Sequence, residues 1–133
     1  MTAADLPAVQ SLDGRIQGDE KPEYWQNMIG SKNVALVSET EGSISGFLLG
    51  EIRSWEFRQP PTGWITAIAV DPRHRRSGLG RRLLAEALDI FRHHGIENVR
   101  TMVDGSDREL HKYFRRMGFT RGPYVELEKK LWG

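Results

Sequence analysis

Residues 70–82 read Val-Asp-Pro-Arg-His-Arg-Arg-Ser-Gly-Leu-Gly-Arg-Arg, and they join an apolar run, Trp64–Val70, to an amphipathic helical pattern that begins near Leu79. Two glycines, at 78 and 80, allow a ligand to approach the backbone closely. Backbone N–H groups gather at the start of a helix, where the macrodipole also favours negative charge. The turn has two interpretations, a cradle for a pyrophosphate or an arginine-rich surface turn that only caps a helix.

The segments on either side of this turn predict a β-α-β unit. The strand Trp64–Val70 is followed by a helix over Leu79–His94, in which leucines, alanine and phenylalanine recur at helical spacing, and by a short strand over Val99–Val103. Such a crossover is right-handed and makes the two strands parallel. Ligands of open sheets of this kind bind at the carboxyl ends of the strands, which is where the glycine-bearing turn lies.

The remaining elements complete a single α/β (α+β) domain over residues 1–133. Two short helices are expected first, from Asp5 as N-cap to Ile16 and from Glu23 to Ile29. Further expectations are strands over Val34–Ser38 and Ile44–Phe57, a helix from Ser106 or Asp107 to Met117, and a strand, turn and strand over Phe119–Leu131.

Composition excludes several classes of protein. The net charge of +1 gives no global basic field, so we expect no nucleic-acid partner. The chain has no cysteine, and its four histidines lack a ligand spacing, so we expect no metal. No apolar run is long enough for a membrane span, and no signal peptide is visible, so we expect a cytoplasmic protein without a membrane partner. A P-loop is absent, and Leu83 stands where a dinucleotide fingerprint needs its third glycine.

Two motifs in order resemble the GNAT superfamily of acetyl-CoA-dependent N-acetyltransferases. The first is Arg75-Arg76-Ser77-Gly78-Leu79-Gly80 after Val70-Asp71-Pro72, which is similar to the family's Arg/Gln-x-x-Gly-x-Gly/Ala after a strand. The second is Tyr113-Phe114-Arg115-Arg116-Met117-Gly118-Phe119, a helix end that leads into Gly-Phe. The resemblance covers about Ile65–Leu131 and favours the cradle. It implies a mixed central sheet flanked by helices, here apparently without the family's first strand.

The resemblance also implies where acetyl-CoA, the cosubstrate, binds. The turn from Arg75 to Arg81 would hold the pyrophosphate through backbone N–H groups, and the strand backbone at Ile68–Val70 would bond the pantetheine arm between splayed parallel strands. A backbone N–H near Ile68 would polarise the acetyl carbonyl. The expected cofactor-binding residues are Ile68, Ala69, Val70, Arg75, Arg76, Ser77, Gly78, Leu79, Gly80, Arg81, Asp107 and Phe114.

Two departures from the family pattern matter. The family often has a tyrosine that protonates the leaving thiolate, but the matching position here is Phe114, so Tyr113, His111 or a water would have to supply the proton. We expect no room for the family's first strand before the first predicted helix, which would leave strand Val34–Ser38 at a sheet edge, and a homodimer is one way to cover it.

The acceptor is expected to be a primary amine of a small molecule or a peptide, attacked directly in a ternary complex. A general base must take a proton from the amine, and Glu51 is the candidate, against the simpler interpretation that it is a strand-face carboxylate paired with Arg53 or Arg58. Trp55 and Phe57 either line the acceptor cleft or pack beneath the helices. An acidic, aromatic region between Asp13 and Trp25 is a further candidate surface for a cationic amine. The alternative function is a non-catalytic module that binds acyl-CoA as a sensor.

Overall fold

The computed structural model describes Asp5, residues 7–9, Leu12 and residues 34–132. Residues 7–9 and Leu12 are helical, as the first predicted helix requires, whereas the predicted helix Glu23–Ile29 and the acidic region lie outside the described residues. By its internal contacts the chain divides into two units, Met1–Met102 and Val103–Gly133, and each is described by itself below.

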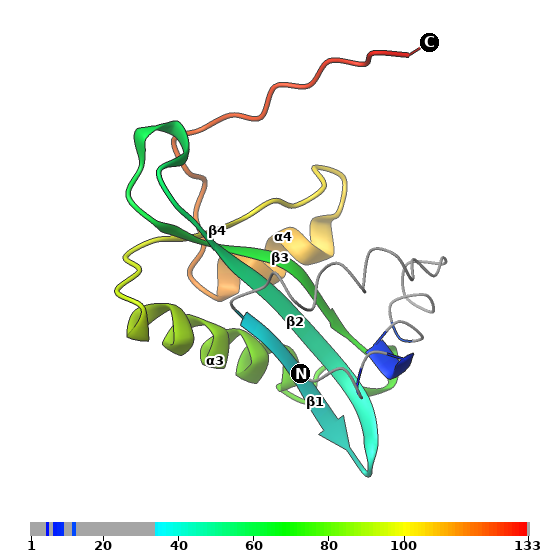
Figure 1. Ribbon diagram of the computed structural model, residues 1–133. Helices are drawn as coiled ribbons and strands as arrows, with labels where there is room; N and C mark the ends of the chain where they lie inside the picture. Colours follow the sequence, from blue (N-terminus) through cyan, green and yellow to red (C-terminus); the bar gives the residue numbers. More distant parts are fainter. Residues whose placement is uncertain (1–4, 6, 10–11, 13–33, 133) are drawn as a thin grey trace. The chain divides into compact units, whose positions relative to one another are not determined.

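The first unit is built on a mixed sheet with the strand order β1-β2-β3-β4 (Figure 1). The first two pairs of neighbours are antiparallel, and β3 with β4 is parallel, as the β-α-β pattern predicts. Among the described residues, β1 and β4 are the edges of this sheet. The edge position of β1 in the whole chain and a dimer that covers it stay predictions. The strands are β1 Val34–Thr40, β2 Ser43–Arg53, β3 Thr62–Val70 and β4 Val99–Thr101.

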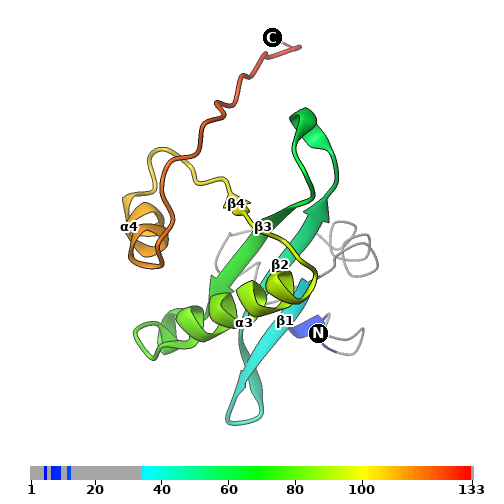
Figure 2. The ribbon, with the colours of Figure 1, turned by 90° about the vertical axis from the view of Figure 1, so that its left-hand side faces the viewer.

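One face of the sheet is covered by helix α3, Leu79–His93, which contacts β1, β2 and β3 (Figures 1 and 2). Its buried residues follow the predicted stripe: Leu83, Leu84, Ala87 and Phe91. The helix lies close to the strands because glycines face it. A Cβ at Gly63 would lie 2.8 Å from the Phe91 ring.

The opposite face carries a second apolar cluster. Side chains alternate along β2, so Phe47 and Leu49 point away from α3. They pack with Ala69 of β3 and with Val9 and Leu12 of the N-terminal helical residues, and all five are 9% exposed or less. The two apolar clusters, one under α3 and one on the opposite face, therefore cover the two faces of the sheet.

The loop between β2 and β3 differs from the predicted long strand. The strand expected over Ile44–Phe57 ends at Arg53, and a single turn of 3-10 helix follows at Glu56–Arg58. Pro60 and Pro61 have no N–H to extend a ladder, so the chain reverses before them. Trp55 and Phe57 are 69% and 76% exposed, so the interpretation that they pack beneath the helices is wrong.

The second unit contains helix α4, Arg108–Arg116, within the range expected for that helix. Asp107 caps it by accepting a hydrogen bond from the Leu110 amide at 3.1 Å. The expected strand, turn and strand over Phe119–Leu131 is wrong, because no strand occurs in residues 119–132. A two-stranded hairpin is marginal without an apolar face to bury, and Leu127 and Leu131 are 92% and 80% exposed.

Candidate active site

The carboxyl end of β3 extends beyond its parallel neighbour. The β3–β4 ladder pairs only Gly63–Ile65 with Val99–Thr101, and the Thr101 hydroxyl donates to the Ile65 carbonyl at 2.9 Å where the pairing ends. β3 continues to Val70, and no strand of the described chain pairs with that side of it beyond Ile65. On the other side, the register with β2 skips Thr66, which forms a β-bulge. Such bulges re-aim the backbone and are common next to active sites.

Asp71 anchors the turn that follows β3. Asp71 is 4% exposed. Its carboxylate accepts hydrogen bonds from the Arg73 amide at 3.0 Å and from the Arg73 guanidinium at 2.9 Å. The Asp71 amide donates to the Ser45 carbonyl on β2 at 2.7 Å, which ties the turn to the sheet. The Asp71 carboxylate raises the pKa of Arg73 above its usual value, first through the side-chain hydrogen bond and then through its charge.

The residues after this anchor form the turn that opens α3. Arg76 and Gly78 have left-handed φ values of 72° and 83°, and Gly78 is the N-cap of the helix. The bond from the Arg82 amide to the Gly78 carbonyl, 3.0 Å, opens the helix. Amides that precede such a first bond point outward along the helix axis.

The side chains around this turn are mostly basic and exposed. Arg75 donates through Nε to the Val70 carbonyl at 3.3 Å, and the Ser77 hydroxyl donates to the His74 carbonyl. The first turn of α3 carries no acidic residue. A Cβ at Gly78 would meet nothing within 4 Å, so there is open space at that position. The exposed arginines are Arg73, Arg75, Arg76, Arg81 and Arg82. This chemistry fits a phosphate-bearing ligand.

At the other end of β3, a carboxylate, an indole and a guanidinium stand in a row across three strands. Glu51 of β2 is in register with Trp64 of β3, which is in register with Arg100 of β4. Glu51 is paired with Arg53, whose Nη2 lies 2.8 Å from Oε1, as the simpler interpretation of Glu51 expects. The Arg53 guanidinium carbon also lies 4.6 Å from the centroid of the Trp64 ring.

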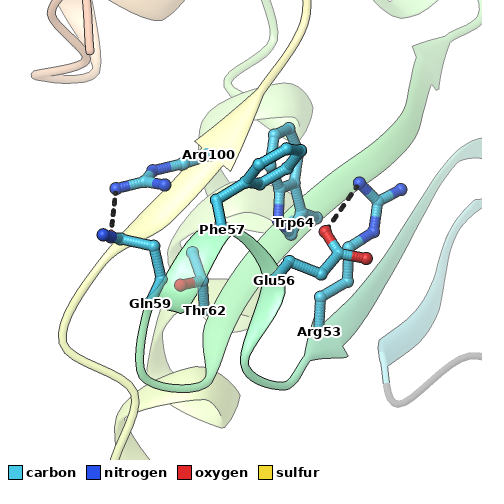
Figure 3. Close-up of a pocket in the computed structure, with 7 residues that line it drawn as sticks. All are labelled: Arg53, Glu56, Phe57, Gln59, Thr62, Trp64 and Arg100. Carbon is cyan, nitrogen blue, oxygen red and sulfur yellow. Dashed lines mark hydrogen bonds and ion pairs between the residues drawn. The ribbon is translucent and has the colours of Figure 1, made fainter. Parts of the chain in front are cut away.

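A shallow pocket opens over this row (Figure 3). The loop between β2 and β3 supplies Phe57 and Gln59, and the Gln59 side-chain oxygen accepts a bond from Arg100 Nη2 at 3.2 Å. In the view of Figure 3, Phe57 and Trp64 lie between the guanidinium groups of Arg53 and Arg100. The residues that line the pocket are Arg53, Glu56, Phe57, Gln59, Thr62, Trp64 and Arg100.

The other sequence-predicted residues lie on α4 in the second unit. Phe114 is 4% exposed, and its ring centroid lies 5.1 Å from that of Tyr113 and 5.1 Å from that of Phe119. His111 and Tyr113 are half-buried. Asp104 accepts from the Ser106 amide at 2.8 Å, and hydrogen bonds from Ser106 lower the pKa of Asp104, with a smaller contribution from the charge of His111.

The predicted cofactor-binding residues Ile68–Val70 and Arg75–Arg81 lie at the end of β3 and from the following turn into the start of α3. Sequence reasoning missed three features of the first unit. The anchoring role of buried Asp71 could have been found from Asp-Pro-Arg, which favours a capped turn. The Thr101 hydroxyl bond and the Glu51–Trp64–Arg100 row have no signal in the sequence, because both depend on strand register.

Comparisons with known proteins identify the fold and its relatives. The model of the acetyltransferase (GNAT) family matches residues 7–119. A mycothiol acetyltransferase of Kytococcus sedentarius is 32% identical over 122 residues, which are 91% of this chain and 35% of that protein. A mycothiol acetyltransferase of Thermobispora bispora is 30% identical over 64% of this chain and 29% of its own length. The chain therefore spans about a third of the length of these relatives.

Solved structures share the fold at low identity. An aminoglycoside 6'-N-acetyltransferase of Acinetobacter haemolyticus superposes with a TM-score of 0.81 at 22% identity, covering 98% of this chain and 96% of that one. A second aminoglycoside acetyltransferase, solved in complex with a bisubstrate analogue of coenzyme A, superposes with a TM-score of 0.84 at 16% identity, covering 98% and 94%.

In the part of the chain that the structure describes, no helix has the length and apolar character that crossing a membrane requires. The same residues contain no group of three or more histidine, aspartate or glutamate side chains placed to hold a metal ion.

Proposed function

Because this chain belongs to the acetyltransferase (GNAT) family, we propose that it transfers an acetyl group from acetyl-CoA to a primary amine by direct attack within a ternary complex. The observation that carries the proposal is the length of β3 beyond its parallel partner, which leads into the glycine-bearing turn before α3. The names of the relatives, mycothiol and aminoglycoside acetyltransferases, support a small-molecule acceptor, and a peptide is the other candidate.

The proposed cosubstrate site runs along the first unit from β3 to α3. The backbone of Ile68, Ala69 and Val70 would bond the pantetheine arm as an added strand would. The turn from Arg75 through Ser77 and Gly78 to Leu79, Gly80 and Arg81 would hold the pyrophosphate, with amides at the helix start and exposed arginines around them. Asp107 and Phe114 stay proposed contacts on the family resemblance alone.

In the proposed reaction, the neutral amine attacks the acetyl carbonyl carbon and the carbon–sulfur bond breaks. A backbone N–H near Ile68 would stabilise the oxyanion of the tetrahedral intermediate. One proton leaves the amine nitrogen and one proton reaches the thiolate sulfur. Tyr113 or His111 is the proposed donor to sulfur, and Glu51 is the proposed acceptor from the amine.

The position of Glu51 requires a chain of ordered waters between it and the amine, because one water extends the reach of a base only to about 5–6 Å. Glu51 is in register with Trp64, four residues before Ile68, which is about 10–13 Å along a bulged strand. A general base acts directly only at about 2.6–3.2 Å. Its pairing with Arg53 gives the carboxylate a fixed position, from which it would act through ordered water.

Thermal stability with acetyl-CoA, CoA, ATP and NAD tests the cosubstrate. A ligand at about 100 times its Kd adds roughly 2.7 kcal/mol, which is several degrees of Tm for a domain of this size. We expect a shift with acetyl-CoA and CoA only. The absence of a shift with any CoA species would contradict the proposed cradle.

CoA release on incubation with a panel of amines separates the enzyme from the alternative, a non-catalytic acyl-CoA-binding module. Turnover supports the enzyme. A Tm shift with acetyl-CoA but no amine-dependent release of CoA supports the binding module instead.

The variant Glu51→Gln tests the base. We expect kcat/KM to fall about 100-fold and the acidic limb of its pH profile to disappear. Glu86→Gln, an exposed change on α3 with the same loss of charge, is the matched control. A pH profile unchanged in shape and height would remove Glu51 from the mechanism.

A further inference from the structure

The backbone groups of β3 change the side to which they point partway along the strand. Gly63 donates its N–H to the Asn98 carbonyl at 3.0 Å, so odd-numbered residues point toward β4 in the first part of β3. Asp71 donates its N–H to the Ser45 carbonyl at 2.7 Å, so odd-numbered residues point toward β2 at the other end. One inserted residue reverses the alternation of an antiparallel ladder, and here it is Thr66, which the register with β2 skips.

This reversal decides which amides reach the open side of β3, where no strand of the described chain pairs beyond Ile65. After the bulge, Ile68 and Val70 point away from β2 and toward that side. The Val70 carbonyl accordingly accepts a bond from Arg75 Nε, outside the sheet, at 3.3 Å. Without the inserted residue, the odd-numbered neighbours of these two residues would face the open side instead. The N–H proposed to polarise the acetyl carbonyl near Ile68 therefore depends on the bulge.

Two threonine hydroxyls hold the bulge from opposite sides. Thr66 Oγ1 donates to the Leu49 carbonyl of β2 at 3.3 Å, and Thr101 Oγ1 of β4 donates to the Ile65 carbonyl at 2.9 Å. Because Ile65 and Thr66 are consecutive, the two bonds tie the point of reversal to both neighbouring strands. A bulge disrupts the ladder locally, so side-chain bonds fix a backbone that the ladder alone holds less firmly.

We propose that the hydroxyls of Thr66 and Thr101 form a clamp that fixes the direction of the Ile68 N–H, and that both threonines are positioning residues for acetyl transfer. Each hydroxyl is bonded to a backbone carbonyl, so it acts through the backbone. An oxyanion donor is effective only when it is aimed at the place where the charge develops, and a displacement of about 1 Å can cost about 100-fold in rate. The inference rests on the proposed function and adds the residues that aim its donor.

Replacing each threonine by valine and by serine separates the hydroxyl from the shape of the side chain. Valine keeps the β-branched shape and loses the donor, whereas serine keeps the donor. We expect Thr66→Val and Thr101→Val to lower the single-turnover rate of CoA release by about 10- to 100-fold. The KM for acetyl-CoA should rise by a smaller factor, because the pyrophosphate is proposed to bind at the turn. Thr66→Ser and Thr101→Ser should react at a rate close to that of the unaltered protein.

These rates are measured with acetyl-CoA and the amine of the panel that releases CoA fastest with the unaltered protein. The matched control is Thr62→Val, because Thr62 lies on the same strand before the bulge and its hydroxyl donates to the Pro60 carbonyl at 2.9 Å. It should lower Tm about as much as the other valine variants and leave the single-turnover rate unchanged. An equal loss of rate in Thr62→Val would mean that any lost hydroxyl bond on β3 slows the reaction, which contradicts the clamp.

The NMR signal of the Ile68 amide tests the direction of the N–H without turnover. In the unaltered protein, acetyl-CoA and CoA should shift this signal differently, because only acetyl-CoA brings an acetyl oxygen to the N–H. In Thr66→Val and Thr101→Val the two ligands should give nearly the same shift. The two threonines are tested separately, so that a variant that fails to fold leaves the other to decide.

Valine variants that keep both the rate and the difference in shift would overturn the inference, as would serine variants that lose as much as the valine variants. Either result would stand even where CoA binds and amines are acetylated. Failure of the proposed function shows differently, as no Tm shift of the unaltered protein with any CoA species.

Discussion

The two ends of β3 reach their chemistry by different routes. At the carboxyl end, the features come from one contiguous segment in which Asp71 holds Arg73 and Gly78 caps α3. At the amino end, the pocket takes Arg53 from β2, Trp64 from β3 and Arg100 from β4. The first end depends on local turn chemistry and the second on strand register. A single substitution should therefore disturb one end selectively, unless it displaces the sheet that both share.

Gly46→Val is expected to have the largest effect, because it displaces the sheet and so disturbs both ends of β3. A Cβ at Gly46 would lie 2.9 Å from the Ala69 carbonyl oxygen and 3.2 Å from Leu83, in a buried part of β2. Backbone cannot yield as a flexible side chain can, so we expect a loss of about 3 kcal/mol or more in the free energy of unfolding. Urea denaturation measures it.

The control for this change is Gly105→Ala. A Cβ at Gly105 would meet nothing within 4 Å, and its φ is not in the left-handed region. Its free energy of unfolding should stay within about 0.5 kcal/mol of the unaltered protein. An equally small loss of stability in Gly46→Val would contradict the close packing of β2 against β3 and α3.

Gly78→Ala should disturb the carboxyl end alone. Its φ of 83° costs an alanine about 1 kcal/mol, and the added methyl projects into the open space where the pyrophosphate is proposed to bind. We expect the Kd for acetyl-CoA to rise about tenfold, measured by calorimetry.

Gly95→Ala is the matched control, because Gly95 has a φ of 74° and open space around its Cβ, but it follows the other end of α3. The two variants should lose similar stability, and only Gly78→Ala should lose affinity for acetyl-CoA. An equal loss of affinity in both would mean that the effect passes through helix stability and not through the cradle.

Arg53→Gln should disturb the amino end alone, by a smaller amount. It removes the ion pair with Glu51 and the stacking on Trp64. Because the Arg53 and Glu51 side chains are 36% and 21% exposed, solvent screens the pair, and we expect a loss of about 1 kcal/mol. A double-mutant cycle with Trp64→Leu should give a coupling of about 0.5–1 kcal/mol.

Arg92→Gln provides the reference for a surface pair. Arg92 and Asp89 are 67% and 66% exposed, so their pair should contribute about 0.5 kcal/mol or less. A coupling between Arg53 and Trp64 no larger than this would mean that the pocket is not a built cluster.

The difference between local turn chemistry and strand register also explains which features the sequence could predict. The strand Trp64–Val70, the turn at Gly78 and the helix from Leu79 were predictable because hydrophobic period, glycine and the Asp-Pro turn act over a few neighbouring residues. The family resemblance then extended the prediction to the ligand. The exposed side chains at Trp55 and Phe57 were not predictable, because aromatic residues favour a strand and the residue types give no signal for the left-handed backbone at these two positions.

Residues 119–132 show that a local pattern can also predict a strand that does not form. Val125 and Leu127 alternate with charged residues as in a strand, yet residues 119–132 contain none. A strand depends on a neighbouring strand, and no local pattern states whether one is present.

Asp104→Asn should have the smallest effect, and it tests the local route in the second unit. Asp104 accepts bonds from the Ser106 amide and hydroxyl at 2.8 and 2.7 Å, and these bonds lower its pKa from 3.8. A carboxylate with a lowered folded-state pKa contributes stability above the unfolded-state value, and this is lost as the pH falls through the folded-state value. Asp104→Asn should therefore be slightly less stable at pH 7, and the difference should shrink as the pH falls below the usual Asp value and vanish once the pH is below the lowered folded-state pKa. Thermal melts at a series of pH values from neutral into the acidic range measure it. A difference that persisted at the lowest pH would show that packing, and not the charge of Asp104, holds the turn before α4.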